Sequence, residues 1–381
     1  MIVLGIETSC DETAAAVVDQ GTLVRSSVVS SQYALHEEYA GVVPEIASRA
    51  HVERLLPVVR LALEEAGMGL GMIDAIAVGH RPGLIGCLLV GTAAAKALAW
   101  SLGKPLIGVD HVHAHVYSGL LRREPTQPTP KEITSPQVHW PALGLVVSGG
   151  HTSLYFADNW LTFRRVGSTI DDAVGEAYDK AATILGLPHP GGPNLDRLAS
   201  SPDANDRAVD LPISRIAPDS LDFSFSGLKT AILYAAKGVP NSRPGTPASL
   251  TIELTHDRKR DLAASFQRAA IAAIILKVKR ALSLLRDQQP KHDQNRNPPA
   301  LITLLVGGGV TANSALRREL ALLESTNNVR VIIPSMEFTM DNAAMIAGLA
   351  HELLSADHIA DMTLAASPMS ELGMPARIGS H

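Results

Sequence analysis

The feature that most constrains the fold is a pattern that occurs twice along the chain. Residues 3–19 read VLGIETSCDETAAAVVD, an apolar run, a small polar turn and a second apolar run. The same order returns at residues 143–158 in LGLVVSGGHTSLYFAD. Each copy is typical of two strands joined by a turn, and the weak repeat predicts a chain built from two similar halves.

Strand and helix patterns alternate after each copy. The apolar runs IDAIAVG and LIGV flank the Ala-rich segment TAAAKALAWSLG, and LITLLV and VRVIIP flank VTANSALRREL. Such alternation predicts the α/β class. The helix expected over residues 45–66 places several apolar side chains on one predicted buried face, namely Val52, Leu55, Leu56, Val59 and Leu63.

The length of 381 residues exceeds what one hydrophobic core usually serves, so two domains are expected. We place them at residues 1–140 and 141–381, with the last helix returning to the first domain and with helices and Pro-rich loops inserted in the second. The net charge of −5 does not predict attraction of the whole chain to nucleic acid. Any such contact requires a local basic patch.

The sequence has two cysteines, Cys10 and Cys87. Two cysteines are too few for a disulfide framework, and this favours a reducing compartment. The first residues lack the basic and apolar regions of a signal peptide, and no run of 18 or more apolar residues occurs. The sequence therefore predicts a cytoplasmic protein without membrane contact.

The segment GVDHVHAH at residues 108–115 is the clearest candidate for a metal site. His111 and His115 are four apart and share one helical face, while His113 points elsewhere. Asp341, at a predicted helix start, is a candidate third ligand. The alternatives are histidines that only pack or cap and an aspartate that is only an N-cap. The spacing also occurs in HExxH peptidases, but Val112 replaces their glutamate, which disfavours that class.

Two Gly-rich turns are candidates for holding an anion or nucleotide. VSGGH, residues 147–151, lies between two predicted strands, and VGGGVTANSALR precedes a predicted helix. Each is by itself also compatible with an ordinary tight turn. Asp11 and Glu12 lie at the tip of the first strand pair, where they are either merely solvated or able to orient a water, a cation or a nucleophile.

Together these segments resemble the TsaD family, the bacterial relatives of the archaeal and eukaryotic threonylcarbamoyl-adenosine synthases. The matching blocks occur in family order from residue 4 to about 350. They are GIETSCDETAAAVV, GVVPEIASRAHVERLLPVV, PGLIGCLLVG, GVDHVHAH, LVVSGGHTSL, GSTIDDAVGEAYDKAATILGLPHPGGP, FSFSGLKTA, GGGVTANSALR and DNAAMIA.

The resemblance implies two related domains of the actin/Hsp70/sugar-kinase (ASKHA) fold around a central cleft. It implies a metal-dependent acyltransferase that moves a threonylcarbamoyl group from threonylcarbamoyl-AMP to N6 of the adenosine 3′ of the anticodon. The acceptors would be tRNAs that read codons starting with A. One Fe²⁺ or Zn²⁺ would be held by His111, His115 and Asp341.

The resemblance also assigns the other site residues. Asp11 and Glu12 match the acidic turn near the reacting carbonyl, and either is a candidate general base. The matched substrate-binding positions are Val147, Ser148, Gly149, Gly150, His151, Asp179, Gly192, Asp196 and Asn313. The implied partners are tRNA, a non-catalytic paralogous subunit that forms a heterodimer, and an ATPase subunit.

Three rival functions stay open at this stage: an ATPase or kinase of the same fold, a nucleotide-linked O-carbamoyltransferase, and a non-catalytic assembly subunit. Candidate tRNA contacts are the basic pairs or clusters at 122–123, 164–165, 277–280 and 317–318. The chain departs from the family where Arg81 replaces the first glycine of the usual Gly-Pro-Gly-Leu element. The Pro-rich segments 122–137 and 238–258 and the polar segment 286–300 have no assigned role.

Overall fold

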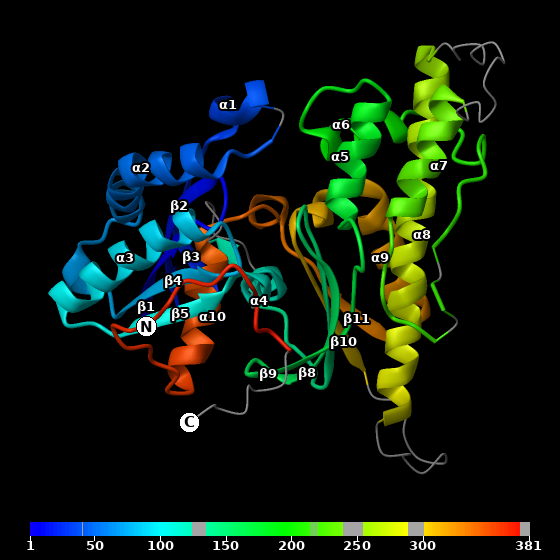
Figure 1. The fold of residues 1–381 in the computed structure, drawn as a ribbon. Helices are drawn as coiled ribbons and strands as arrows, with labels where there is room; N and C mark the ends of the chain where they lie inside the picture. The colour runs from blue at the N-terminus through cyan, green and yellow to red at the C-terminus, as the bar shows by residue number, and fades with distance from the viewer. Residues whose placement is uncertain are drawn as a thin grey trace, which may run out of the picture.

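The computed structural model describes residues 1–39, 41–123, 135–214, 216–217, 219–238, 254–288 and 301–373. The described chain forms two lobes, each built around one β-sheet (Figure 1). Most of the three segments expected to be surface loops, 122–137, 238–258 and 286–300, lies outside the described residues.

The first sheet has the order β5-β4-β1-β2-β3-β6. β1 pairs antiparallel with β2 and parallel with β4, while β2–β3 is antiparallel and β4–β5 is parallel. Its strands are β1 Ile2–Glu7, β2 Glu12–Asp19, β3 Leu23–Ser31, β4 Ala75–Arg81, β5 Leu106–Asp110 and β6 Arg122–Arg123.

The second sheet repeats this plan. Its order β11-β10-β7-β8-β9 places the strands as in the first sheet, with antiparallel β7–β8 and β8–β9 and parallel β7–β10 and β10–β11. The strands are β7 Ala142–Val147, β8 Thr152–Asn159, β9 Thr162–Ser168, β10 Ile302–Gly307 and β11 Val329–Ile332. The predicted repeat and the α/β class are confirmed, and the duplicated sheet is that of an ASKHA fold.

Two long helices, α2 (Pro44–Glu65) and α3 (Ile85–Leu102), cover one face of the first sheet. The predicted buried face of α2 is partly wrong. Leu55, Val59 and Leu63 are buried, but Val52 and Leu56 are each 65% exposed. The small side chains of α2, Ala47, Ala50 and Ala62, are buried instead, and their size gave a weak apolar signal. Short elements nearby are α1 Tyr33–His36, η1 Glu37–Tyr39 and η2 Leu70–Met72.

Among the described residues, α3 is the one helix with the length and hydropathy of a membrane span, and 33% of that window is buried. Its apolar run is interrupted by Lys96. Core helices pass the same test, and α3 packs on β4 and α2 through Cys87, Leu88 and Ala95.

The second lobe carries a helical layer inserted between β9 and β10. The 33-residue α8 (His256–Gln288) is buried along one side by the sheet and by its neighbouring helices (Figure 1). The same insertion contains α5 Val174–Ile184, α6 Gly191–Ala199 and α7 Ser226–Lys237, whereas η4 Gly309–Ala312 and α9 Ser314–Thr326 lie between β10 and β11.

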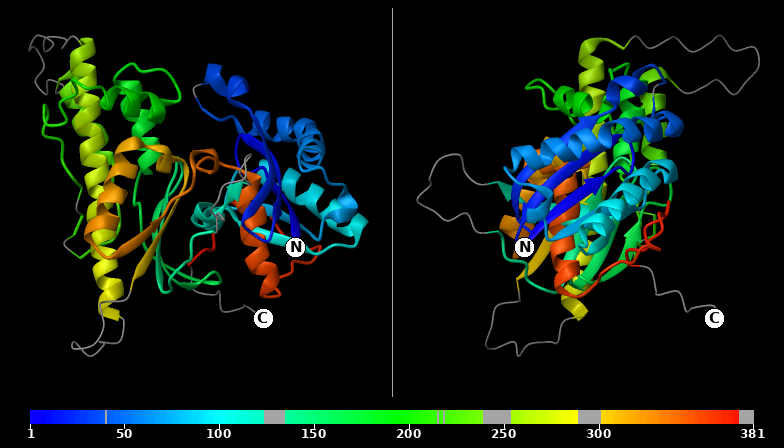
Figure 2. Two further views of the ribbon diagram at one scale, coloured as in Figure 1. Left: turned by 180° about the vertical axis from the view of Figure 1, so that it is seen from behind. Right: turned by 90° about the vertical axis from the view of Figure 1, so that its left-hand side faces the viewer.

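The helices that follow the last strand of each repeat meet between the lobes. α4 (His111–Tyr117) follows β5 but packs on β7 and β10 of the other sheet, with η3 (Ser118–Leu120) after it. α10 (Ala343–Ser355) follows β11 and η5 (Met336–Phe338), yet packs on β1 and β2 of the first sheet and against α4 (Figure 2). The division of domains at residue 140 stays a prediction.

Candidate active site

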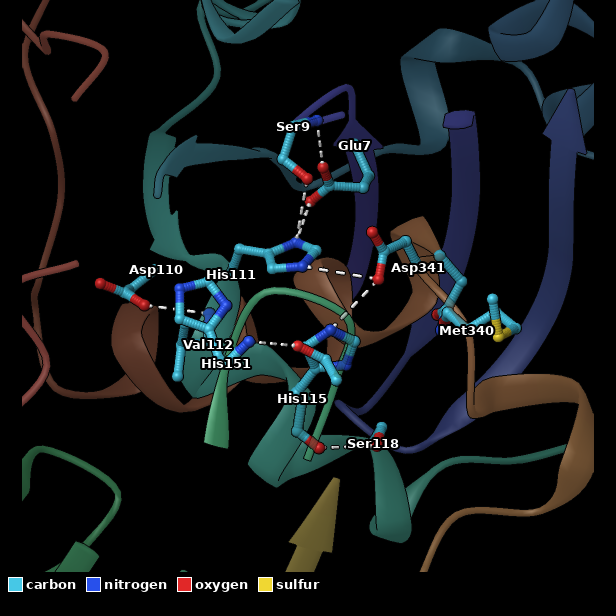
Figure 3. A network of polar contacts seen from close by, with 12 residues as sticks. Glu7, Ser9, Asp110, His111, Val112, His115, Ser118, His151, Met340 and Asp341 are labelled. Atoms are coloured by element: carbon cyan, nitrogen blue, oxygen red, sulfur yellow. Dashed lines mark hydrogen bonds and ion pairs between the residues drawn. The ribbon is translucent and has the colours of Figure 1, made fainter. Parts of the chain in front are cut away.

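Two histidines and one aspartate from distant parts of the chain meet between the lobes (Figure 3). Nε2 of His115 lies 3.2 Å from Oδ1 of Asp341, and Nε2 of His111 lies 3.5 Å from the same oxygen. The candidate ligand atoms all lie within 4.8 Å of one another, a spacing that one cation can bridge. The structure thus brings together the residues predicted to be metal ligands.

The start of α10 distinguishes between the two predicted roles of Asp341, a helix N-cap and a metal ligand. The N-cap of α10 is Asn342, whose Oδ1 accepts the Met345 N–H at 2.9 Å. Asp341 stands one residue earlier and turns its carboxylate toward the histidines (Figure 3). The alternative in which Asp341 is only the N-cap is therefore wrong.

The surroundings of the His115 ring support a cation at this position. Its side chain is buried, and neither ring nitrogen has a hydrogen bond of good geometry among the described residues, although Nε2 faces Asp341. A buried polar atom left without a partner costs about 1 to 3 kcal/mol. Two imidazole nitrogens and a carboxylate oxygen suit Zn²⁺ or Fe²⁺, so this donor set fits the predicted metal.

Glu7, which the sequence did not single out, orients the first histidine. It ends β1 with its side chain fully buried, and Oε2 lies 3.1 Å from Nδ1 of His111. Its Oε1 accepts the Ser9 N–H at 2.5 Å, and Ser9 Oγ lies 3.3 Å from the same His111 nitrogen. A carboxylate at Nδ1 directs Nε2 toward the metal position. The only signal in the sequence is an acidic residue ending an apolar strand.

The ionisable side chains of this cluster shift one another's pKa values. Burial by itself lowers the pKa of His111, but the carboxylates of Asp341 and Glu7 outweigh it and raise that pKa well above the ordinary value. Burial likewise opposes ionisation of Asp341, but the neighbouring histidines hold its pKa well below the ordinary value. Burial and the nearby His111 lower the pKa of His115, which keeps its ring neutral and able to bind a cation.

The glycines of VGGG have a packing role that the sequence did not reveal. A Cβ on Gly307 would lie 1.9 Å from the His115 carbonyl oxygen, so only glycine lets α4 approach β10 this closely. Gly308, with φ of 97°, lies against the carbonyl of Val147 in the same way. These residues therefore bring α4 and the SGGH turn together.

The SGGH turn connects β7 to β8 beside the candidate metal site of His111, His115 and Asp341. The Ser148 N–H donates to the His151 carbonyl at 2.7 Å, and the His151 N–H donates to Ser148 Oγ at 3.0 Å. No hydrogen bond within the described chain uses the amides of Gly149 and Gly150, and both residues are exposed. Burial and the adjacent His111 and His115 lower the pKa of His151 to about 4. The turn thus offers two amides to an anion next to the metal position.

The acidic turn lies where β1 passes into β2. Oε1 of Glu12 accepts the Ser31 hydroxyl at 2.9 Å, while its buried Oε2 has no hydrogen bond to any residue that the structure describes. Burial, with small contributions from Asp11 and Asp341, raises the pKa of Glu12 to about 7 and outweighs the opposing Ser31 hydrogen bond. A carboxyl with this pKa can exchange a proton near neutral pH.

The remaining predicted substrate residues form a second group, in the second lobe. Asp196 accepts the Ser314 N–H at 3.0 Å and the Gln267 side-chain amide at 3.0 Å, which fixes α6 to α8 and α9. Asn313 caps α9 through the Leu316 N–H at 2.9 Å and donates to Gln267 at 2.8 Å. Gln267 joins the two, and its place in the middle of a long helix gave no signal.

Asp179 belongs to the same region. Its Oδ1 accepts the Gly192 N–H at 3.0 Å, and this bond attaches the first turn of α6 to α5. Nothing lies within 4 Å of the position a Cβ would take on Gly192, so this backbone is open to a ligand.

His113 is directed away from the cluster, as predicted. Its ring lies 4.5 Å from that of Phe163 and 6.3 Å from that of Trp160, measured between centroids. Burial lowers the pKa of His113 to about 3, so it stays neutral. It is a packing residue between the lobes.

Several residues of the predicted basic clusters serve the fold instead. Lys277 and Arg280 each donate to the Ser220 carbonyl at 2.7 Å, and Arg317 donates to the Thr311 carbonyl at 2.7 Å. Arg123 pairs with Glu337 at 2.8 Å. These contacts give the four cations a structural role, and Arg122 and Arg164 likewise donate to Ser135 and Gln288. Contact of any of these clusters with tRNA stays a prediction.

Comparison with known proteins gives this geometry a family. A family model described as tRNA N6-adenosine threonylcarbamoyltransferase matches residues 23–348. The protein of that name from Trichlorobacter lovleyi is 46% identical over 377 residues, which cover 99% of this chain and 98% of the relative. The chain belongs to the TsaD family.

Other TsaD relatives agree. The protein of the same name from Moorella thermoacetica is 43% identical and covers 96% of this chain, with 96% of its own length matched. Among solved structures, component A of (R)-2-hydroxyglutaryl-CoA dehydratase from Acidaminococcus fermentans is similar, with a TM-score of 0.47 and 13% identity over 93% of this chain and 99% of that one. The resemblance inferred from the nine sequence blocks is confirmed.

Proposed function

We propose that this chain is a tRNA N6-adenosine threonylcarbamoyltransferase that uses threonylcarbamoyl-AMP as donor. The acceptor is N6 of the adenosine 3′ of the anticodon in tRNAs reading codons that start with A. The observation that carries the proposal is the convergence of His111, His115 and Asp341 beside the SGGH turn, in a chain whose relatives bear this name.

The reaction is an acyl transfer. The N6 nitrogen attacks the carbamoyl carbon of the mixed anhydride and forms a C–N bond. The bond between that carbon and the phosphate oxygen breaks, AMP leaves, and N6 loses a proton. The chain must therefore hold the donor, stabilise the negative charge that develops on the oxygens, and accept one proton.

Named residues supply these tasks in the proposal. His111, His115 and Asp341 would hold one Fe²⁺ or Zn²⁺, which supplies Lewis-acid chemistry toward the carbamoyl oxygen or binds the threonyl part. Gly149 and Gly150 are exposed, and their amides can donate to developing negative charge.

Two side chains are candidates for the base. We assign proton removal from N6 to Glu12, because its pKa of about 7 suits a general base at neutral pH. Asp11, its neighbour in the turn, would hold the tRNA or the donor.

The decisive experiment measures transfer from threonylcarbamoyl-AMP to an unmodified tRNA. His111→Ala is expected to lower the rate about 100-fold or more, because a metal ligand is lost. The matched control is His113→Leu, two residues along the same helix, whose neutral ring only packs and whose variant should keep near wild-type transfer. No product from the wild type would overturn the proposed function, and equal rates in wild type and His111→Ala would remove the metal from it.

The same purified protein can be assayed for each of the three rival functions. An ATPase or kinase of this fold would turn over ATP without a need for His111 and His115, so metal content and ATP hydrolysis are measured together. An O-carbamoyltransferase would transfer to a small hydroxyl compound and not to tRNA. A non-catalytic assembly subunit would bind tRNA or partners without transfer.

We infer that the paralogous subunit docks on the outer side of α2 and α3. Val52 and Leu56 on α2 are each 65% exposed, and Ile85 and Leu89 on α3 are 48% and 54% exposed. The two helices pack side by side with Gly86 against Ser48, so these apolar side chains gather on one surface. Leu56→Asp should abolish heterodimer formation in analytical ultracentrifugation without loss of folding.

On the basis of the family resemblance, we also propose an ATPase subunit as a second partner and a cytoplasmic location.

A further inference from the structure

The chain after α10 forms a strap, residues 360–373, that returns along the first lobe. Ala360 pairs with Leu106 at the start of β5, and Leu364 lies against Gly108 of the same strand. Further along, the Ser367 N–H donates to the His80 carbonyl at 3.0 Å, and His80 Nδ1 lies 2.9 Å from the Ala365 carbonyl oxygen. The strap therefore runs beside β5 and β4 toward Asp110, the residue just before α4.

At that residue, Asp110, the strap meets the helix that carries His111 and His115. Asp110 is buried, and its Oδ1 accepts the N–H groups of Val112 at 3.0 Å and His113 at 3.3 Å. Its other oxygen, Oδ2, accepts the Ser370 hydroxyl of the strap at 2.7 Å. One carboxylate thus joins the strap to the first turn of α4.

Arg81 adds a charge to this junction. Its Nε lies 3.6 Å from Asp110 Oδ2, and its Nη1 forms an ion pair with Glu371 of the strap. Asp110 is therefore held on one side by the helix amides and on the other by Ser370 and Arg81.

We propose that the strap is a positioning element for the metal-binding helix, acting through Ser370, Arg81 and Asp110. The physical reason is that Asp110 is the residue next to His111 and caps the helix turn on which His111 stands. When Ser370 and Arg81 restrain one carboxylate oxygen, the other oxygen holds the Val112 and His113 amides in place. The effect on metal binding rests on the proposed metal site, whereas the restraint of α4 does not.

The first test follows the helix turn directly, in the full chain without added metal. Ser370→Ala is expected to speed hydrogen exchange at the Val112 and His113 amides about fivefold, the factor of one ordinary hydrogen bond. Ser370→Thr keeps a hydroxyl and should restore wild-type exchange. Ser367→Ala is the matched control, because its hydroxyl bonds only Met369 within the strap. Arg81→Gly should change exchange in the same direction as Ser370→Ala.

The second test measures affinity for Co²⁺ alone, followed by its visible absorption. Ser370→Ala should weaken binding about threefold to tenfold, less than the 10–100-fold typical of a residue that bonds a metal ligand directly. Thermal unfolding of the same variants shows whether any loss is general.

The outcomes separate the strap from the metal site. Unchanged exchange at Val112 and His113 in both Ser370→Ala and Arg81→Gly would overturn the inference. Faster exchange with unaltered Co²⁺ affinity would overturn the strap's role in the metal site. Faster exchange in a chain whose wild type binds no Co²⁺ would support the restraint of α4 and overturn the proposed metal site.

Discussion

Glu12 illustrates how surroundings change the chemistry of a single residue. In the sequence it is an acid at a turn, which is ordinarily solvated and ionised. In the structure, burial raises its pKa to about 7, and one carboxylate oxygen has no hydrogen bond within the described part of the chain. A carboxyl that is half ionised near pH 7 can accept a proton from an attacking amine and release it to water.

Substituting Glu12 by Gln should lower the transfer rate about 100-fold, within the usual range for loss of a general base. In the wild type, kcat should fall as pH drops below about 7, because the carboxyl becomes protonated, and the variant should lack this limb. Donor affinity, measured separately by calorimetry, should not change. Near-normal turnover of the variant would remove Glu12 from the role of base.

The same pKa predicts an effect on stability with a definite sign. The folded pKa of Glu12 lies above its ordinary value of 4.5, so the folded state holds this proton more tightly than the unfolded state does. Its contribution to stability is complete below pH 4.5 and is lost as pH rises to about 7. Glu12→Gln should therefore raise the free energy of unfolding by about 1 kcal/mol at pH 8, after allowance for solvent screening of this partly exposed group. Urea unfolding at pH 4.5 should show little difference, and a less stable variant at pH 8 would contradict the assigned pKa direction.

Among the elements, α4 is the one whose placement matters most for the site. It is short, it follows a strand of the first sheet, and it is buried by strands of the second sheet. Asp110 caps its first turn, and Gly307 of β10 gives it room at its carbonyl side. Small displacements of this helix move both histidines relative to Asp341.

Replacing Gly307 by Ala should destabilise the protein by about 3 kcal/mol, because the new Cβ would lie 1.9 Å from the His115 carbonyl and must push α4 away. Loss of metal affinity should accompany the change. Gly144→Ala in β7 is the matched control, since its nearest neighbour would lie 3.5 Å away, an ordinary contact. Equal denaturant midpoints for the two variants would show that α4 does not depend on this close approach.

At the scale of the whole molecule, α1 of the first lobe contacts the segment before α6 of the second lobe. Tyr33 of α1 stacks on His189 of the second lobe with ring centroids 5.4 Å apart, and its hydroxyl donates to the His189 carbonyl at 3.2 Å. α1 and α6 face each other across the upper side of the molecule (Figure 1). His189 precedes the Pro-Gly-Gly segment that contains Gly192.

Removing this bridge with Tyr33→Ala should weaken binding of threonylcarbamoyl-AMP about threefold to tenfold, because the approach of the lobes loses a stacked pair and a hydrogen bond. Tyr33→Phe keeps the stacking and should lose less than half of that effect on a logarithmic scale. Calorimetric titration measures both. Unchanged affinity in Tyr33→Ala would show that the contact does not help to hold the donor.

The local pattern of the sequence was enough for the repeat, the alternation of strands and helices, the candidate metal ligands His111 and His115, and the family. These features depend on residue type and spacing along a short stretch, and nine ordered blocks supply many independent matches. The side of α2 that is buried was only partly predicted, because Ala47, Ala50 and Ala62 are buried while Val52 and Leu56 are exposed. Periodicity alone does not distinguish an apolar residue in the core from one that stays exposed.

Only the tertiary structure decided which distant residues act together. Glu7 behind His111, Gln267 between Asp196 and Asn313, and the strap behind Asp110 join positions separated by 46 to 260 residues in sequence. Each depends on polar contacts, which have no periodicity and leave no local pattern. The packing of α10 on the first sheet brings Asp341 and the strap to α4, whereas the Gln267 contacts depend on the helical layer of the second lobe. The residue types of the candidate ligands could thus be read from short motifs. Their orientation depends on how the two lobes pack together.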